Sequence, residues 1–368
     1  MRIALDVSSA ARAESTGVAM YIRRMVAAFA RLKESGEPHR FTLVTRASRL
    51  KNVFRQSPVP APNFKNKLML EGLHPVFSRA TDIFHGLDAR LPGKWMRAAT
   101  VVTIHDVFSA LQSTEFATEE FRAMKRNRYQ ELIARADRIV CVSESVRRDV
   151  LSALQPDPAK LRVVHEAGGE GFFPRSPEEV QAVRARHGLD RPYYIFVGSV
   201  NKRKNVPVLA EAFAAAKQKT GSDAILALAG RIGYGGGEIR AALEKSAAGG
   251  ALKLLGYVPD ADIPGLYSGA QALLFSTLYE GFGIPVVEAF ACGCPVIGAN
   301  VGSLPEIIGD AGLLPDPRDV DSIAAAVVRF MEDEIFRKKC AQLGLERAKQ
   351  FSWDKAAQEC LQIYRELL

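Results

Sequence analysis

Short apolar runs alternate with longer amphipathic segments along the whole chain. Runs rich in β-branched and aromatic residues predict strands at 2–7, 41–45, 100–105, 138–142, 161–165, 193–198, 224–230, 252–258, 272–277 and 295–299. Segments with a helical period lie between them, among them 17–34, 119–136 and 143–154. Because the strands are continuously apolar and alternate with helices, they indicate parallel sheets covered on both faces. Two such blocks predict an α/β protein with two Rossmann-like domains.

The break between the two blocks lies at 168–191, where glycines and prolines interrupt the apolar period. We expect a first domain at residues 1–170, a linker region at 171–191 and a second domain at 192–351. An amphipathic helix at 352–368 either joins the first domain or packs elsewhere, and its pattern does not decide between the two. Open parallel sheets bind ligands beyond the carboxyl ends of their strands, so we expect the active site in a cleft between the domains.

Composition narrows the class of protein. Hydrophobic residues make up 48% of the chain, which argues against disorder. No apolar run approaches the roughly 18 residues that a membrane-spanning helix needs. The five cysteines are scattered and odd in number, which favours reduced thiols in the cytosol. The opening stretch MRIALDVSSA reads as a first strand rather than a signal peptide, so we expect a cytoplasmic protein.

The net charge of +8 belongs to the first half of the chain. Residues 1–170 hold 27 Lys and Arg against 18 Asp and Glu, whereas the remaining residues hold 22 against 23. Two interpretations stay open: a solvated basic surface, or a surface that meets an anionic partner such as a membrane or a lipid phosphate. Basic motifs interleaved with aromatic residues are missing, so nucleic acid is not expected as a partner.

Two glutamates flank a glycine turn in YEGFGIPVVE, residues 279–288. Glu280 follows a predicted strand, and Pro285 is suited to the first turn of the helix that carries Glu288. Gly281 and Gly283 allow a sharp turn and a close approach to a ligand, and the helix amides favour an anion such as phosphate. Glu288 is then placed to bind a ribose diol, and Glu280 to face what the phosphate carries. The alternative is that both acids only complement the helix dipole.

Further candidates follow other predicted strands. Arg203 and Lys204, in VGSVNKRKN, suit a diphosphate, although a solvated loop also contains such residues. Gly17 opens the first predicted helix at the position of a phosphate loop, without a G-x-G-x-x-G or Walker lysine. His105 and Asp106 end one strand and His85 ends a shorter one. For each histidine, a buried structural role competes with a ligand contact.

Other tempting motifs have simpler explanations. Asp260-Ala-Asp262 resembles a metal-binding pair, but an aspartate before a helix is ordinary N-cap chemistry. Cys292-Gly-Cys294 has too few neighbouring ligands for zinc and fits a tight corner between helix and strand. The glycines of GYGGGE at 233–238 have the wrong spacing for a dinucleotide fingerprint.

Together these motifs resemble the retaining nucleotide-sugar glycosyltransferases of GT-B fold that carry an E-x7-E motif. The segment from Glu280 to Glu288 fits that motif, and CGCPVIGANVGSLPEIIGDAGLLPDP continues it. FVGSVNKRKNV, LGYVPDADIPGLYSGA, TIHDVFSAL, CVSESVRRDVL and the glycine at Gly17 follow the family order, so the resemblance covers essentially the whole chain.

The resemblance implies roles for single residues. Arg203 and Lys204 hold the donor diphosphate, and Glu288 binds the ribose. Glu280 contacts the transferred sugar and phosphate together with the amides of the turn, which belong to Phe282, Gly283 and Ile284. His105 bonds the sugar, and Gly17 lets the first domain close on the diphosphate. Ser199 stands where many relatives have an arginine, which leaves Arg203 as the substitute. His85 and Asp106 are candidates for the acceptor side.

The resemblance also implies the reaction. It favours a metal-independent hexosyltransferase without a cofactor that moves mannose from GDP-mannose to a saccharide or lipid-linked acceptor, in envelope polysaccharide or glycolipid synthesis. UDP-glucose and UDP-N-acetylglucosamine remain alternative donors.

The basic first half suggests peripheral contact with the inner face of an anionic membrane, with 23–31 and 49–67 as candidate segments. A dinucleotide-dependent dehydrogenase or a non-catalytic nucleotide-binding protein is the alternative of another class.

Overall fold

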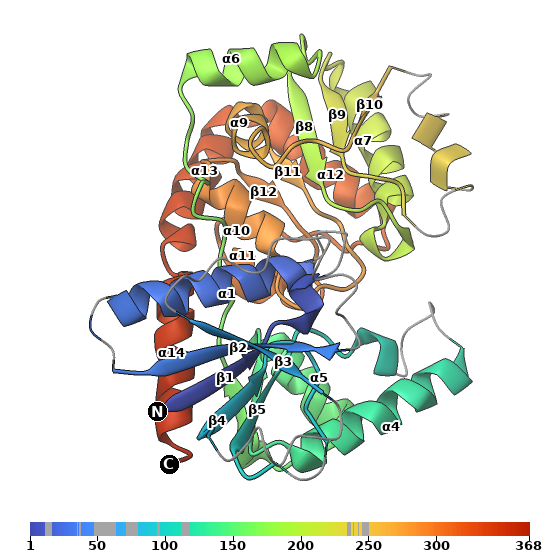
Figure 1. Ribbon diagram of the computed structural model, residues 1–368. Coiled ribbons are helices and arrows are strands. Elements are labelled where there is room, and N and C mark those ends of the chain that lie inside the picture. The colour runs from blue at the N-terminus through green and yellow to red at the C-terminus, as the bar shows by residue number, and fades with distance from the viewer. Residues whose placement is uncertain are drawn as a thin grey trace. The chain divides into compact units, whose positions relative to one another are not determined.

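The chain forms two compact units in the computed structural model. Unit 1 comprises Met1–Glu166 together with Ser352–Leu368, and unit 2 comprises Ala167–Phe351 (Figure 1). The structure describes residues 1–11, 17–34, 36, 38–47, 64–70, 80–93, 96–111, 118–233, 237, 239–241, 243–244 and 250–368. The chain therefore passes between the units twice, at Glu166 to Ala167 and at Phe351 to Ser352.

Unit 1 is built on a seven-stranded parallel sheet with strand order β3-β2-β1-β4-β5-β6-β7. Its strands are β1 (Arg2–Asp6), β2 (Arg40–Arg46), β3 (Lys65–Met69), β4 (Ile83–Gly86), β5 (Ala99–Ile104), β6 (Arg138–Cys141) and β7 (Leu161–Val163). The chain winds outward from β1 to β3 and then returns to place β4 on the other side of β1. The loops after β1 and β4 therefore meet where the strand order reverses, which is the usual ligand-binding edge of such a sheet.

The helices of unit 1 cover this sheet. They are α1 (Gly17–Glu34), α4 (Glu119–Arg135), α5 (Glu144–Leu154) and α14 (Trp353–Arg365), with short 3-10 turns η1 (Ser8–Ala11), η3 (Phe108–Ala110) and η4 (Pro158–Lys160). α1 and α14 pack against each other (Figure 1). The Tyr21 and Trp353 rings meet edge to face at 5.6 Å, and Arg31 donates to Asp354 at 2.6 Å. The helix at 352–368 therefore belongs to unit 1. Of the two arrangements that its sequence left open, this is the one in which it joins the first domain.

Unit 2 carries a six-stranded parallel sheet with order β10-β9-β8-β11-β12-β13. Its strands are β8 (Tyr193–Val197), β9 (Ile225–Ala229), β10 (Leu252–Gly256), β11 (Leu273–Leu274), β12 (Val296–Ile297) and β13 (Gly312–Leu313). Its helices are α6 (Pro177–Arg186), α7 (Val206–Thr220), α9 (Ile263–Gly269), α10 (Ile284–Ala291), α11 (Leu304–Ile308), α12 (Val320–Glu332) and α13 (Glu334–Ala348), with the 3-10 turn η5 (Lys202–Lys204). Here the order reverses between β8 and β11, so the loops after these two strands share one edge.

The segment predicted as a linker, 171–191, is part of unit 2 and holds α6. A capping box at Ser176 starts this helix, and its buried Val183 packs against α9. A Cβ at Gly265 of α9 would lie 2.8 Å from the Val183 side chain. The polar surface of α6 concealed this packing in the sequence, because one buried valine per helix leaves little periodic signal.

The predicted strands correspond to observed ones, but no predicted strand covers β3 or β13. Four of the five β3 residues are exposed, so no apolar run marks this edge strand. All five cysteines are buried and unbridged, as expected for reduced thiols. Among the described residues, no helix is long and apolar enough to cross a membrane.

Candidate functional site

The switch point of unit 2 brings Glu280, Lys204 and Arg203 together. The loop after β8 supplies both cations, and the loop after β11 supplies the carboxylate. Lys204 Nζ donates to Glu280 Oε2 at 2.5 Å, and Arg203 Nη1 lies 3.4 Å from the same oxygen. Arg203 Nη1 also donates to the carbonyl of Tyr279 at 2.7 Å. Two adjacent cations and a carboxylate 76 residues from Lys204 thus form one charged cluster, at the edge of the sheet where a ligand is expected.

Backbone and side-chain bonds fix the cation loop against the loop that carries Glu280. The amide of Leu278 donates to the Arg203 carbonyl at 2.8 Å, and the Thr277 hydroxyl donates to the same carbonyl at 3.1 Å. Asn205 ends η5 in the left-handed conformation, at φ 56°, and its side chain donates to the Pro317 carbonyl at 2.6 Å. These bonds hold the two cations at the sheet edge instead of leaving them in solvent.

The Lys204–Glu280 pair is buried, with side-chain exposures of 10% and 16%. Burial alone would raise the pKa of Glu280, but the charges of Lys204 and Arg203 outweigh burial and lower it. Burial lowers the pKa of Lys204, and Glu280 opposes that shift. The Lys204 ammonium also lies 4.3 Å from the centroid of the Phe275 ring, a favourable cation–π contact. The two cations thus favour the ionised form of the Glu280 carboxyl.

A glycine turn leads from Glu280 into α10. Gly283 adopts φ +104°, and Pro285 occupies the first turn of the helix. Ser303 Oγ donates to the carbonyls of Phe282 and Glu280, at 2.7 and 3.1 Å. A Cβ at Gly302 would lie 2.6 Å from the Glu280 carbonyl, so only glycine fits beside the turn. Ser303 and Gly302 support the turn, and neither was among the residues predicted for the site.

The remaining donor-side candidates lie on the same unit, apart from Gly17. Glu288 is buried on α10, one turn beyond Ile284, which begins that helix. Ser199 is exposed after Gly198, which has φ +143°. Gly17 opens α1 in unit 1 and is exposed, with open space where a Cβ would point. The residues just before Gly17 lie outside the described residues.

His105 holds a defined position at the end of β5 in unit 1. Its Nδ1 lies 2.9 Å from Glu166 Oε1, and its Nε2 lies 3.0 Å from the Leu87 carbonyl oxygen. Burial would lower the pKa of His105, but the hydrogen bond and charge of Glu166 raise it above the ordinary value. The structure thus pairs His105 with a carboxylate that was not among the residues predicted for the site.

His85 does not reach any site, so its prediction as an acceptor-side residue is wrong. It lies in the middle of the sheet, where β4 pairs with β1 and β5, and is fully buried. Its Nδ1 lies 2.5 Å from the Tyr364 hydroxyl, and its Nε2 lies 2.9 Å from Thr103 Oγ1. Burial lowers the pKa of His85 to about 3. It is a neutral core histidine that links α14 to the sheet.

Asp106 lines a polar pocket of about 390 Å³ at the switch point of unit 1. Ser9 and Asp88 reach the pocket from the loops after β1 and β4, and their side chains are 2.6 Å apart. Lys125 and Arg128 reach it from α4. The full lining is Ser9, Val18, Asp88, Ala89, Arg90, Asp106, Lys125, Arg128, Tyr129 and Leu132. Carboxylates, a hydroxyl and cations in one pocket suit a polyhydroxylated ligand that carries negative charge.

The Asp262 carboxylate of the Asp260-Ala-Asp262 motif is paired with basic side chains. The Asp262 carboxylate accepts from Arg186 at 2.7 Å and from His187 at 2.9 Å, and it makes no N-cap bond to α9. The expected capping role is therefore wrong, because α6 supplies stronger partners. Within the described residues, no three His, Cys, Asp or Glu side chains are grouped so as to hold a metal ion.

Comparison with solved structures defines the fold. Sucrose-phosphate synthase from Thermosynechococcus elongatus superposes with a TM-score of 0.74, over 100% of this chain and 98% of its own, at 21% identity. WaaG, a glycosyltransferase involved in lipopolysaccharide biosynthesis, superposes with a TM-score of 0.73, over 98% and 99%, at 15% identity. Two parallel-sheet α/β units of this kind constitute the GT-B fold of glycosyltransferases.

Sequence comparison supplies the family. The model for glycosyltransferase family 4 matches residues 15–167, and the model for glycosyl transferases group 1 matches residues 179–347. O-antigen chain mannosyltransferase B of Escherichia coli is 33% identical over 289 residues, 77% of this chain and 74% of its own. The serotype-specific mannosyltransferase WbdA of Escherichia coli is 27% identical over 274 residues, 73% of this chain but 34% of its own. The chain belongs to the group 1 glycosyltransferases.

Proposed function

We propose that this glycosyltransferase moves mannose from GDP-mannose to a saccharide or lipid-linked acceptor, with retention of configuration and without a metal ion. The observation that carries the proposal is the cluster of Glu280, Lys204 and Arg203 at the glycine turn before α10. It joins two cations, a carboxylate and a helix N-terminus at one sheet edge. These are the groups that a sugar bound through a diphosphate requires.

Breaking the bond between sugar and diphosphate places positive charge on the sugar and negative charge on the departing group. Arg203, Lys204 and the amides at the start of α10 stabilise that negative charge as it develops. Lys204 has three N–H donors, so it can hold Glu280 and a phosphate oxygen at once. Glu280 is then kept beside the diphosphate, where it contacts the sugar, and Glu288 binds the ribose.

Retention follows from attack on the same face that the diphosphate leaves. The bond from the anomeric carbon to the phosphate oxygen breaks, and the acceptor oxygen bonds to that carbon from the same side. The acceptor proton passes to the departing diphosphate, so no protein nucleophile is required. We assign His105 to the transferred sugar and Gly17 to the diphosphate. The absence of a protein nucleophile from this mechanism agrees with the contacts of Glu280, whose carboxylate is paired with two cations.

Mannose is proposed as the transferred sugar because two relatives are named as mannosyltransferases. One is O-antigen chain mannosyltransferase B, at 33% identity, and the other is WbdA. Their names also favour a saccharide acceptor in envelope polysaccharide synthesis. UDP-glucose and UDP-N-acetylglucosamine are the competing donors, and a solved structure of Anabaena HepE with UDP and glucose has the same fold at 15% identity.

We assign the acceptor to the polar pocket of unit 1, which Asp106 lines. Its volume of about 390 Å³ falls within the usual range for small-ligand sites. Asp88 and Asp106 suit sugar hydroxyls, and Lys125 and Arg128 suit a phosphate that links the saccharide to a lipid. The pocket supports an acceptor that is a saccharide with an attached anion.

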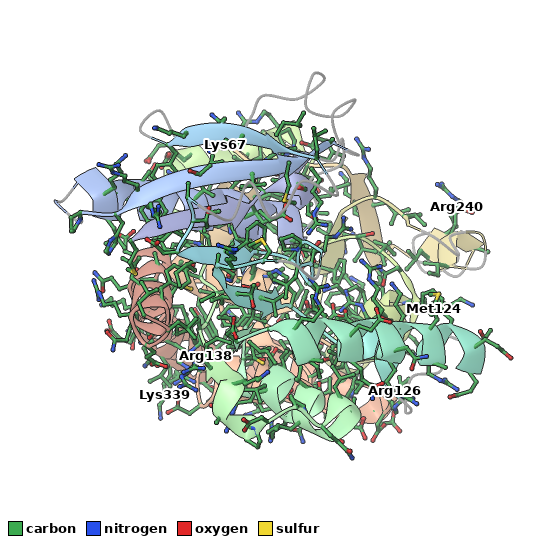
Figure 2. The ribbon with its side chains drawn as sticks, turned by 60° about the horizontal axis from the view of Figure 1, so that its bottom comes forward. Lys67, Met124, Arg126, Arg138, Arg240 and Lys339 are labelled. Carbon is green, nitrogen blue, oxygen red and sulfur yellow. The ribbon has the colours of Figure 1, made fainter. Side chains whose placement is uncertain are left out.

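The structure changes where peripheral membrane contact is proposed. In the segment 23–31, Arg31 pairs with Asp354, Arg23 donates to the Ala10 carbonyl at 3.3 Å, and Phe29 is buried, so much of this segment is engaged within unit 1. Of the segment 49–67, residues 49–63 lie outside the described residues, and Phe64 is buried against Phe41. On α4, by contrast, Phe121 and Met124 are 42% and 54% exposed among basic side chains. Met124 is labelled in Figure 2.

Exposed apolar groups among cations suit an anionic membrane, so we move the proposed contact to α4. The test is co-sedimentation with phosphatidylglycerol vesicles at low salt. The contact is supported if high salt abolishes binding to the vesicles and if Met124→Ser weakens it. Absence of co-sedimentation at low salt contradicts it.

Thermal unfolding with GDP, UDP, ADP and their sugars tests the donor, because a ligand of the folded state raises the apparent stability by mass action. We expect the largest rise in Tm with GDP and GDP-mannose. A rise confined to UDP-sugars would replace the donor but keep the reaction. Nicotinamide cofactors serve as the comparison for a dehydrogenase. Transfer in the presence of EDTA and NMR analysis of the product linkage then test metal independence and retention.

A further inference from the structure

Glu166 is a buried carboxylate at the point where the chain leaves unit 1. It follows β7 and is 6% exposed, and its Oε1 lies 2.9 Å from His105 Nδ1. A carboxylate removed from water needs a charged or hydrogen-bonded partner to remain ionised. His105 provides that partner, across 61 residues of sequence. A buried carboxylate and a largely buried imidazole of unit 1 are therefore hydrogen-bonded to each other.

Both ring nitrogens of His105 face atoms that accept hydrogen bonds. Glu166 Oε1 accepts from Nδ1, and the carbonyl oxygen of Leu87 accepts from Nε2 at 3.0 Å. A histidine that donates from both nitrogens is an imidazolium. The ring cannot rotate without breaking both bonds, and the edge-to-face contact with Tyr21 at 4.5 Å further restricts it.

The two places where the chain passes between the units are both anchored near this imidazole. Glu166 is the last residue before the first crossing, and it bonds His105 directly. Trp353 is the second residue after the other crossing, and it packs on Tyr21, whose ring contacts His105. The Tyr21 hydroxyl lies 3.3 Å from Thr103 Oγ1, which bonds His85. His105, Tyr21 and their contacts thus connect both places where the chain passes between the units to the end of β5.

We propose that Glu166 is a positioning residue for transfer: it fixes His105 through Nδ1 and keeps the Nε2–H directed at the carboxyl end of β4, where the sugar is bound. This deepens the proposed function and rests on the assignment of His105 to the sugar. The Nε2–H exchanges the Leu87 carbonyl for a sugar hydroxyl, while Glu166 holds the ring in place. Other groups that face His105 are Asp88 after β4, His85 on β4 and Tyr21 on α1.

The first experiment needs no activity. The chain has six histidines, and ¹⁵N labelling with a His105→Asn spectrum for assignment isolates the His105 signals. We expect a titration midpoint above that of free histidine, about 6.5, because Glu166 raises the pKa of His105. In Glu166→Gln the amide oxygen still accepts from Nδ1 but the charge is lost, so the midpoint should fall by at least about one unit. A wild-type midpoint at or below that of free histidine, or one that Glu166→Gln leaves unchanged, overturns the proposal.

The second experiment uses transfer from GDP-mannose. Since the raised pKa keeps His105 charged up to a higher pH, kcat should fall as pH rises through it. Glu166→Gln should move that fall to lower pH and reduce kcat above about pH 7 by about tenfold, with little change in the donor KM. Glu131→Gln, an exposed carboxylate on α4, is the matched control and should change neither quantity. A Glu166→Gln profile that superposes on wild type contradicts the proposal.

The two experiments separate the possible failures. If no nucleotide sugar supports transfer while the histidine titrates as expected, the proposed function fails and the pairing stands. If transfer occurs and the titration is that of free histidine, the role of Glu166 fails alone. Should Glu166→Gln not fold, the wild-type titration and Glu166→Asp decide, because a shortened carboxylate keeps the charge but should lower kcat.

Discussion

Replacing Lys204 with methionine removes the ammonium from the cluster and keeps an unbranched side chain beside Phe275. Glu280 then remains buried with Arg203 at 3.4 Å as its charged neighbour. Removing one partner of a buried ion pair costs about 3 to 5 kcal/mol, and we expect the lower end, about 3 kcal/mol, because Arg203 remains. At about 2 to 4 °C per kcal/mol for a unit of this size, Tm should fall by about 6 to 12 °C.

The same substitution should weaken nucleotide binding. A hydrogen bond to a charged group contributes about 1.5 to 3 kcal/mol, so GDP should bind about 10- to 100-fold less tightly. Isothermal titration calorimetry of the folded variant with GDP measures this directly. An unchanged Kd would refute the placement of Lys204 at the diphosphate.

A double variant separates stability from binding. Lys204→Met with Glu280→Gln removes both charges, so no carboxylate is left buried beside a missing partner. We expect the double variant to recover most of the lost Tm, while its GDP affinity stays as weak as that of the single variant. If the double variant is as unstable as the single one, the cost does not arise from an unpaired Glu280.

Three further substitutions test other parts of the structure. Glu280→Gln should lower the transfer rate by about a hundredfold or more, measured with the true acceptor, and a full rate would contradict its role at the sugar. Gly302→Ala should lower Tm more than Gly221→Ala does, because both glycines have positive φ but only Gly302 would place its Cβ against the Glu280 backbone. The folded-state pKa of His85 is about 3, so the native state binds fewer protons there than the unfolded chain between about pH 6.5 and 3. Stability should therefore fall as pH falls through that window, by up to about 5 kcal/mol, and His85→Asn should show a flatter pH dependence in urea titrations.

The sheets could be predicted because their strands are apolar on both faces. The pattern identified ten strands directly, and β4 through the shorter run that contains His85. β3 escaped because its lysines face outward at a sheet edge. The position of α14 was left open for a different reason: amphipathic residues show that a face is buried but not what covers it. Contacts such as Tyr364 with His85, 279 residues apart, decide it.

The candidate site was partly predictable for a topological reason. Arg203, Lys204 and Glu280 follow strands that end at one sheet edge, so their positions in the sequence predicted their proximity. His85 also seemed to end a strand, but the register of β4 places it inside the sheet. Glu166 and Ser303 could not be found this way, since each acts through a tertiary contact that no local pattern records.

The position of α14 has a consequence for how the protein folds during synthesis. A ribosome completes residues 1–166 long before it makes Trp353 and Tyr364, which are buried in unit 1. Until then His85 lacks its Tyr364 partner, and the surface of α1 that α14 covers is open to water. Unit 2 is continuous in sequence, so it can complete its core first, although domains made earlier usually fold earlier. On the nascent chain, unit 1 therefore cannot complete its core until residues 352–368, which follow unit 2 in the sequence, have been synthesised.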